Sequence, residues 1–166
     1  MDVNHCLRCA APLEDRPIDG VSRRACSAHC GFVHWDNPVP VIAALVQWGD
    51  RFVLARNATW PAGVFSVISG FLERGESPAA TLARETKEEL GLQVEASRFI
   101  GHYLVRDANL LMIGFAVQTS GDLATSDEIT ETKLVTRAEL AAYDFGRLTL
   151  TQQLVRDWLD TPERSS

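Results

Sequence analysis

The sequence predicts an α/β fold in which a mixed sheet lies between helices, preceded by a small cysteine-rich unit. Apolar runs of strand length lie on both sides of one well-delimited amphipathic segment, and a second amphipathic segment lies near the end of the chain. All four cysteines fall within the first 30 residues. The 166 residues have room for one main domain and a small appendage. We expect these at 35–160 and 1–34, with a tail at 161–166.

Composition excludes some classes of protein. Hydrophobic residues make up 46% of the chain and charged residues 23%, which is typical of a soluble globular protein. No apolar run approaches the roughly 18 residues that a membrane span needs, so no membrane partner is expected. The N-terminus lacks a basic stretch followed by an apolar one, which favours a cytoplasmic protein. The net charge of -6 argues against a general nucleic-acid binder and suits a carboxylate site that uses divalent cations to meet an anionic substrate.

The cysteines occur in two pairs, Cys6 with Cys9 and Cys26 with Cys30. This arrangement matches the ligands of a structural zinc site, in which four thiolates surround the metal. Two disulfides are the alternative, but they rarely persist in the reducing compartment expected for this chain. A segment of about 30 residues buries too little surface to fold unaided, so we expect Zn²⁺ to supply most of its stability.

The main domain is expected to open with three strands. The apolar run 41–46 is typical of a buried strand, and a turn at Gly49-Asp50 leads into a second strand at 52–55. A third strand is expected at 64–68.

A helix over 78–90 is delimited at both ends. Ser77 is an N-cap, Pro78 occupies the first helical position, and Gly91 follows the last periodic residue. The positions expected to face the sheet are Ala79, Leu82, Ala83, Thr86 and Leu90. The remaining elements are expected as apolar stretches at 99–105 and 110–117, a polar loop at 119–128, a strand at 131–135 and a helix at 147–159.

Three glutamates gather on another face of this helix. Glu85, Glu88 and Glu89 stand at i, i+3 and i+4, so their side chains are neighbours and repel one another. The cluster is either a solvated acidic face, offset by Arg84 and Lys87, or a site for hard divalent cations such as Mg²⁺ or Mn²⁺. The cluster alone does not decide between the two.

The surrounding residues resemble the catalytic motif of the Nudix hydrolase family, the Nudix box. The matching identities are Gly70, Glu76, Arg84-Glu85, Glu88-Glu89 and Leu90-Gly91-Leu92. Thr86 departs from the pattern, which usually has an aliphatic residue there, and we interpret it as a tolerated change in the core. The resemblance implies a mixed sheet between helices and an enzyme that cleaves a diphosphate linkage by attack of water on phosphorus.

The resemblance also implies roles for these residues. The divalent ions would be bound by the carbonyl of Gly70 and the carboxylates of Glu85, Glu88 and Glu89. Arg84 and Glu76 would pair to fix the loop against the helix, because metal ligands need an oriented outer shell.

Nudix enzymes commonly take a further glutamate, as ligand or general base, from a loop beyond the box. The candidates here are Glu128 and Glu131. We favour Glu128, because its position before a strand resembles the loop glutamate of the NADH pyrophosphatase branch.

The cysteine pairs ahead of the Nudix box resemble the zinc ribbon of that same branch. The second pair departs by one residue from the usual Cys-x-x-Cys-Gly spacing. His29 is therefore an alternative to one of these cysteines, although four thiolates are the simpler ligand set.

The resemblance predicts a nucleotide substrate, as a nucleoside diphosphate linked to a further group: an NADH-like dinucleotide, ADP-ribose or FAD. The region 102–109 lacks the prolines that usually follow the box in the NADH pyrophosphatase group. Trp60, Phe65 and Tyr103 are candidates for stacking on the base, with core packing equally open for each.

Two other functions stay open. A Nudix fold can serve as a ligand sensor without catalysis, although the complete set of box glutamates argues against this. Alternatively, the N-terminal segment could bind RNA or act in decapping, because Arg8, Arg16, Arg23 and Arg24 make it locally basic. Relatives are often homodimers, which is the basis for expecting one here.

Overall fold

The computed structural model describes residues 3–161 and divides the chain into two compact units, Met1–Asn37 and Pro38–Ser166. All but the first residue of the expected tail at 161–166 lies outside the described residues. Among residues 3–161, no helix has the length and apolar character needed to cross a membrane.

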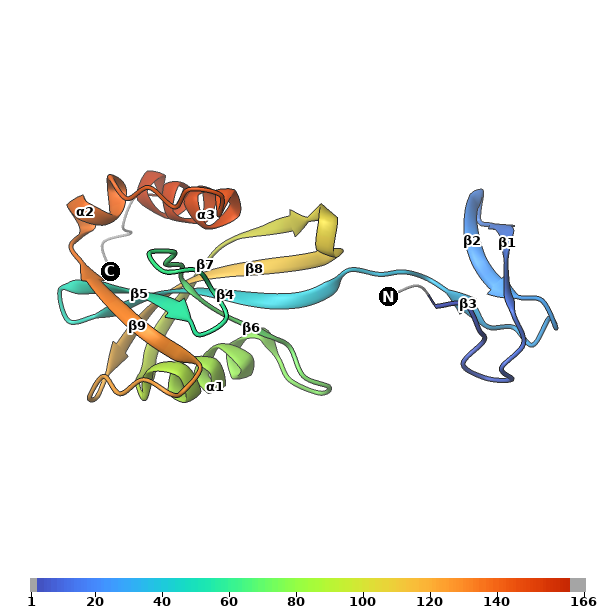
Figure 1. Ribbon diagram of the computed structural model, residues 1–166, viewed down its shortest axis with the longest axis horizontal. Coiled ribbons are helices and arrows are strands. Elements are labelled where there is room, and N and C mark those ends of the chain that lie inside the picture. The colour runs from blue at the N-terminus through green and yellow to red at the C-terminus, as the bar shows by residue number, and fades with distance from the viewer. Residues whose placement is uncertain (1–2, 162–166) are drawn as a thin grey trace. The chain divides into compact units, whose positions relative to one another are not determined.

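The N-terminal unit is a three-stranded antiparallel sheet (Figure 1). Its strands are β1 (Leu13–Ile18), β2 (Val21–Cys26) and β3 (Val33–His34). Asp19 and Gly20 join β1 to β2 with φ values of 50° and 79°. Positive φ at both central residues is the geometry of a two-residue hairpin turn with the twist of the strands, which Asp-Gly favours. The apolar core of this unit is small and contains Cys6, Leu13 and Cys26.

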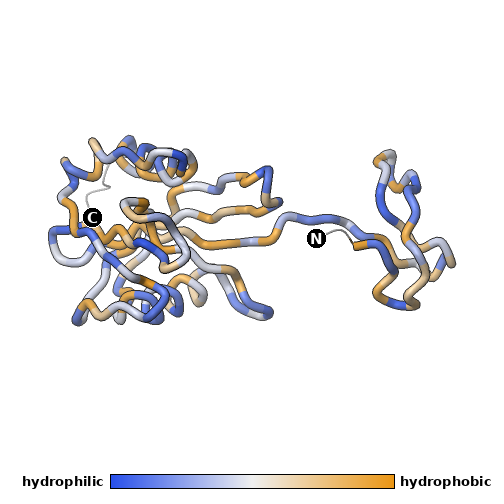
Figure 2. Tube along the Cα trace, in the orientation of Figure 1, coloured by the Kyte–Doolittle hydropathy of each residue, from blue (hydrophilic) through white to orange (hydrophobic). Residues whose placement is uncertain are grey.

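The second unit is built on a six-stranded mixed sheet of order β7-β8-β4-β5-β9, with β6 paired to β4. β4 pairs with β8 in parallel and with β5 and β6 in antiparallel. The strands are β4 (Val39–Trp48), β5 (Arg51–Asn57), β6 (Ile68–Phe71), β7 (Gln93–Val105), β8 (Leu110–Ser120) and β9 (Ile129–Val135). A short 3₁₀ helix, η1 (Arg106–Ala108), joins β7 to β8. Residues 41–46 of β4 are an unbroken, buried apolar run (Figure 2), because helices cover the sheet on both faces.

The helix α1 (Pro78–Leu90) lies on one face of the sheet, and α2 (Arg137–Ala141) and α3 (Thr149–Asp160) lie on the other (Figure 1). Two separate cores result. Ile42, Ala44 and Val46 pack on the α1 side, whereas Ala43 and Leu45 pack on the α3 side. The predicted mixed sheet between helices is confirmed.

Local capping sets the ends of α1 where the sequence predicts them. The Ser77 hydroxyl accepts a hydrogen bond from the Ala80 amide at 3.2 Å, and Gly91 takes φ 70° while its N–H reaches the Lys87 carbonyl. A glycine carries no Cβ penalty in this left-handed conformation, so it ends the helix.

The buried face of α1 differs from the expected one. Ala79 and Ala83 are exposed, whereas Thr81 and Glu89 are buried together with the expected Leu82, Thr86 and Leu90. Burying a methyl group gains little free energy, so the two alanines do not determine how the helix packs.

The expected strand at 64–68 begins later than predicted, as β6, and only Ser66 in the preceding loop forms a bridge, to Ala55. Gly63, at φ 82°, turns the chain just before this run. Phe65, Val67 and Ile68 are buried all the same, which explains why this run resembles a strand in sequence. α2 is missing from the predicted elements, although Thr136 and Glu139 form a reciprocal capping box at its start.

Candidate active site

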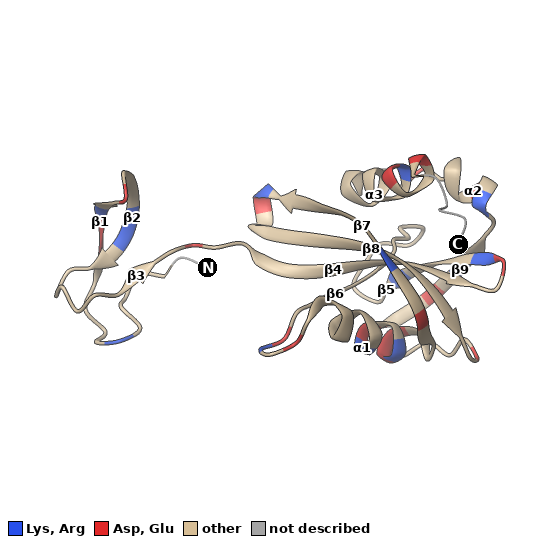
Figure 3. Ribbon diagram, turned by 180° about the vertical axis from the view of Figure 1, so that it is seen from behind, with Lys and Arg blue, Asp and Glu red and all other residues tan. Residues whose placement is uncertain are grey.

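Arg84 is the centre of the hydrogen bonds that join α1 to the loop before it. Its Nε and Nη2 bind the two carboxylate oxygens of Glu76 at 2.8 and 3.0 Å, and Nη2 also donates to the Phe71 carbonyl at 3.1 Å. Nη1 donates to Glu85 at 2.8 Å and to Glu88 at 3.0 Å. Bonds from Arg84 hold the pKa of Glu76 at about 2, so this carboxylate is charged at neutral pH. Figure 3 shows the acidic and basic residues side by side on α1.

Gly70 on β6 lies against the side chain of Glu85. A Cβ at position 70 would meet the Glu85 Oε1 atom at 1.9 Å, so no larger residue fits without displacing this carboxylate. The missing side chain of Gly70 allows this close approach. Conformational freedom is not the reason for a glycine here, because the φ of Gly70 is not in the left-handed region. The backbone of Gly70 and a carboxylate oxygen are thus brought together, as a shared oxygen-rich cation site would require.

Glu89 is buried, with 8% of its surface exposed. Burial, together with the charges of Glu85, Glu128 and Glu88, raises its pKa to about 7, and burial raises the pKa of Glu85 as well. A bound cation would favour the ionised form of both carboxylates. The donors are all oxygens, which suits hard ions such as Mg²⁺ or Mn²⁺.

The structure distinguishes the two loop candidates. Glu128 is exposed in the loop before β9, and its charge contributes to the raised pKa values of Glu85 and Glu89. This loop is joined to the C-terminal end of α1, because Ser126 N donates to the Glu89 carbonyl at 3.2 Å. Glu131 instead forms an ion pair with Arg56, with Nε and Oε2 3.1 Å apart. Glu128 therefore belongs electrostatically with the Nudix box glutamates.

The four cysteines converge in the N-terminal unit. Their Sγ atoms lie within 4.8 Å of one another, and the pairs Cys6–Cys30 and Cys9–Cys26 are each 3.4 Å apart. Four thiolates that each bind one zinc ion at about 2.3 Å lie at similar distances from one another, so the donor set fits Zn²⁺. A hydrogen bond from the backbone of Cys30 lowers the pKa of Cys26, whereas hydrogen bonds with the neighbouring thiols raise the pKa of Cys9 and Cys30.

His29, the alternative ligand, lies outside this group. It is exposed, with φ 54°, next to the cysteine that it would replace. Within the described residues 3–161, the thiols form the one group of three or more metal-ligating side chains whose donor atoms converge in this way. Arg84 donates hydrogen bonds to the carboxylates of Glu85 and Glu88, which are therefore neighbours on α1.

The three aromatic candidates lie in different surroundings. Trp60 lines a small cavity of about 50 Å³ together with Glu89, Asn57 and Ser69. Phe65 is buried in the α3-side core, with the Lys133 ammonium 4.9 Å from its ring centroid.

Tyr103 is also in the α3-side core, and its hydroxyl donates to Asp157 on α3 at 2.8 Å. Its side chain packs over the cross-strand pair of Gly101 and Gly114: a Cβ added at Gly101 would lie 2.9 Å from the hydroxyl oxygen, and one at Gly114 would lie 3.1 Å from the ring. Among the three aromatic candidates, only Trp60 shares a cavity with a box carboxylate.

Two features of the site lacked a sequence signal. The hydroxyl of Thr81 donates to Glu76 at 2.8 Å, which adds to the bonds that hold the loop. Arg56 on β5 contacts both Glu131 and the backbone of Trp60. Neither residue belongs to the box pattern, and their partners become neighbours only in the folded chain.

Comparison with known proteins shows the family and the fold of this chain. The family model for the NUDIX domain matches residues 36–154, which is more than half of the chain. The chain belongs to the Nudix family. A solved Nudix hydrolase from Nitrosomonas europaea has the same fold, with a TM-score of 0.76 and 22% identity, and the match covers 96% of this chain and 95% of that one.

Two curated relatives of this Nudix protein carry functional names. The NAD-capped RNA hydrolase NudC of Mycobacterium tuberculosis is 42% identical over 107 residues, which is 62% of this chain and 34% of that protein. The mitochondrial NAD(P)H pyrophosphatase NUDT13 of Homo sapiens is 25% identical over 184 residues, covering 97% of this chain and 51% of that protein. The chain spans about a third to a half of the length of these relatives.

Proposed function

We propose that this Nudix protein is a metal-dependent pyrophosphohydrolase. It cleaves the diphosphate linkage of a nucleoside diphosphate derivative, with NADH-like dinucleotides, ADP-ribose and FAD as the substrate class. The observation that carries this proposal is the contact between the Gly70 backbone and the Glu85 carboxylate beside the buried Glu89. A ligand sensor would not need the carboxylates of Glu85 and Glu89, whose ionisation is opposed by burial and by neighbouring charges.

Mg²⁺ or Mn²⁺ is proposed to bind the Gly70 carbonyl and the carboxylates of Glu85, Glu88, Glu89 and Glu128, where it would polarise the phosphate and stabilise the leaving group. Arg84 and Glu76 keep the loop at 71–76 fixed against α1, so that these oxygens stay close to one another. Glu128, exposed in its loop, supplies either a further oxygen ligand or the general base for the attacking water.

The substrate class is supported by the names of the relatives, which refer to NAD-capped RNA and to NAD(P)H. Trp60 is the aromatic residue that we assign to the base, because it lines the cavity that Glu89 also lines. The buried positions of Phe65 and Tyr103 give no such support, although both were candidates from the sequence.

The N-terminal unit is proposed to hold a structural Zn²⁺ through Cys6, Cys9, Cys26 and Cys30, within a cytoplasmic homodimer. RNA binding by this unit has less support, because residues 1–37 contain four arginines, no lysine and five acidic residues. A basic surplus is what binding to phosphates would require. Weak or salt-insensitive RNA binding is therefore expected.

The test is cleavage of a substrate panel by the wild type and by Glu89→Gln. The panel contains NADH, NAD, ADP-ribose, FAD, Ap4A and nucleoside triphosphates, each with Mg²⁺ or Mn²⁺. We expect cleavage of at least one dinucleotide or ADP-ribose, and loss of about 100-fold or more of kcat in the variant, since an anionic ligand is replaced by a neutral amide.

Glu95→Gln is the matched control, because Glu95 is an exposed glutamate on β7 outside the box. It should leave the rates unchanged. If no compound is cleaved with either metal, the hydrolase proposal is wrong and the ligand-sensor hypothesis takes its place.

A further inference from the structure

The wall of the Glu89 cavity that contains Trp60 is a short turn at the end of β5. Asn57 stabilises this turn, because its side-chain oxygen accepts hydrogen bonds from the Thr59 amide at 3.0 Å and from the Thr59 hydroxyl at 2.7 Å. The Trp60 amide donates to the Asn57 carbonyl at 3.0 Å. These bonds shape the turn, but they do not fix it relative to Glu89.

Backbone bonds join the turn to the loop that carries Glu128. The Ala58 amide donates to the Glu128 carbonyl at 2.8 Å, and the hydroxyl of Thr130 donates to the Arg56 carbonyl at 3.2 Å. The same loop is bound to α1 through the carbonyl of Glu89. Trp60, Glu128 and Glu89 are therefore connected through one series of hydrogen bonds.

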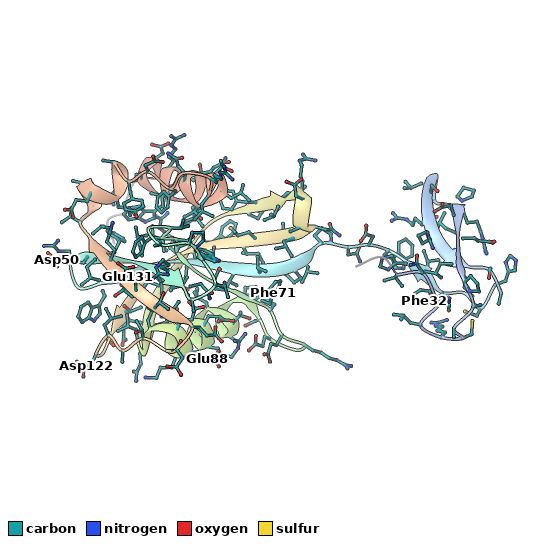
Figure 4. All side chains as sticks on the ribbon, viewed as in Figure 1. Phe32, Asp50, Phe71, Glu88, Asp122 and Glu131 are labelled. Carbon is teal, nitrogen blue, oxygen red and sulfur yellow. The ribbon has the colours of Figure 1, made fainter. Side chains whose placement is uncertain are left out.

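The side chain of Arg56 adds a second connection between the Trp60 turn and β9. Arg56 is paired with Glu131 across β5 and β9, and the register shifts directly after it. Its Nε binds the Glu131 carboxylate at 3.1 Å, and its Nη1 donates to the Trp60 carbonyl at 3.4 Å. The Arg56 side chain is 19% exposed and that of Glu131 54% exposed, so the ion pair is open to water on the Glu131 side while the guanidinium itself is largely covered. Figure 4 shows Glu131 on β9 and Glu88 on α1.

We propose that Arg56 is a positioning residue for substrate binding, which holds the Trp60 turn in place through Glu131 and the Trp60 carbonyl. The planar guanidinium bridges two acceptors on different elements, which neither a lysine nor a glutamine does with the same geometry. Glu131, the weaker candidate for a metal ligand, thus acts through Arg56. This inference rests on the proposed function, because it assigns Trp60 to substrate binding.

The experiment compares Arg56→Gln, Glu131→Gln and the double variant with the wild type, in steady-state kinetics with NADH and ADP-ribose. We expect Arg56→Gln to raise KM about tenfold while kcat changes less than about threefold, because a loosened wall weakens binding and leaves the box in place. Glu131→Gln should raise KM by less. The KM of the double variant should be no higher than that of Arg56→Gln, because both substitutions break the same linkage.

Arg51→Gln is the matched control. Arg51 lies on the same strand, and it forms ion pairs at the surface with Asp50 at 3.6 Å and with Glu139 at 4.0 Å. It removes the same charge from β5 without touching the Trp60 turn. An equal rise of KM in Arg51→Gln and Arg56→Gln overturns the proposal, as does an unchanged KM in Arg56→Gln.

A second measurement does not depend on catalysis. Acrylamide quenching of Trp60, obtained as the difference between each protein and the same protein carrying Trp60→Phe, should increase in Arg56→Gln and stay at the wild-type level in Arg51→Gln. Unchanged quenching in Arg56→Gln overturns the proposal even if KM rises. If the wild type cleaves none of the panel, the proposed function fails, while quenching still decides whether Arg56 fixes the turn.

Discussion

Thr86 lies in the Nudix box at a position where an aliphatic side chain is usual, and it is completely buried in α1. Its hydroxyl has no hydrogen-bond partner among residues 3–161, and a buried hydroxyl without a partner lowers stability. Thr86→Val removes this hydroxyl at nearly constant volume, and we expect it to stabilise the protein by about 1–2 kcal/mol. Thermal unfolding should show a melting temperature about 2–8 °C higher.

Thr81 provides the control, because it is equally buried on the same helix but its hydroxyl donates to Glu76 at 2.8 Å. Thr81→Val should destabilise the protein, since it leaves a carboxylate with one donor fewer. A lower melting temperature for Thr86→Val would show that its hydroxyl is satisfied by water.

At the scale of elements, Glu76 fixes the loop at 71–76 to α1 through Arg84 and Thr81. Its pKa is about 2, compared with 4.5 in an unfolded chain, chiefly because of the Arg84 guanidinium. The folded state thus favours the ionised form. This contribution to stability is fully present above pH 4.5 and is lost as the pH falls from there toward 2.

We therefore expect Glu76→Gln to unfold at a lower urea concentration than the wild type at pH 7, with the difference shrinking steadily below about pH 4.5. Urea midpoints of both proteins between pH 7 and pH 3 measure this. A difference that stays constant over that range would mean that the charge of Glu76 is not what holds the loop.

The same elements show where the sequence suffices and where it does not. The ends of α1 and the turn after β4 depend on neighbours in the chain, namely Ser77, Gly91 and Gly49, and they were predicted closely. The start of β6 and the rotation of α1 depend on contacts with other strands, so the apolar run at 64–68 and the alanines of α1 were misleading.

The candidate site also has features that follow from the local sequence and features that depend on long-range contacts. The box places Glu85, Glu88 and Glu89 on one helix, so their proximity follows from helical spacing. The sequence favours Glu128 over Glu131 only by its position before a strand, whereas the pairing of β5 with β9, which sets Arg56 opposite Glu131, separates their surroundings. The same pairing brings Arg56 to the Trp60 turn. Long-range register of this kind is not encoded in any local pattern.

At the scale of the whole molecule, the two units offer different metal ligands. The N-terminal unit presents four thiolates, which prefer soft or borderline ions such as Zn²⁺, whereas the Nudix domain presents carboxylate oxygens, which suit Mg²⁺ or Mn²⁺. We expect the small core around Cys6, Leu13 and Cys26 to be insufficient to fold the N-terminal unit alone. Zinc binding, which contributes on the order of 10–16 kcal/mol in comparable peptides, would supply the difference.

We expect a strong chelator to remove one zinc ion per chain and to unfold β1–β3, while the sheet of the Nudix domain stays folded. Amide NMR spectra before and after chelation measure both, and a chromogenic indicator counts the released zinc.

Adding back Mg²⁺ alone should restore hydrolysis only if the carboxylate site works independently of the thiolate site. Adding Zn²⁺ should restore the signals of β1–β3 whether or not hydrolysis returns. If these signals persist in metal-free protein, hydrophobic packing alone folds the N-terminal unit, and the four cysteines need another explanation.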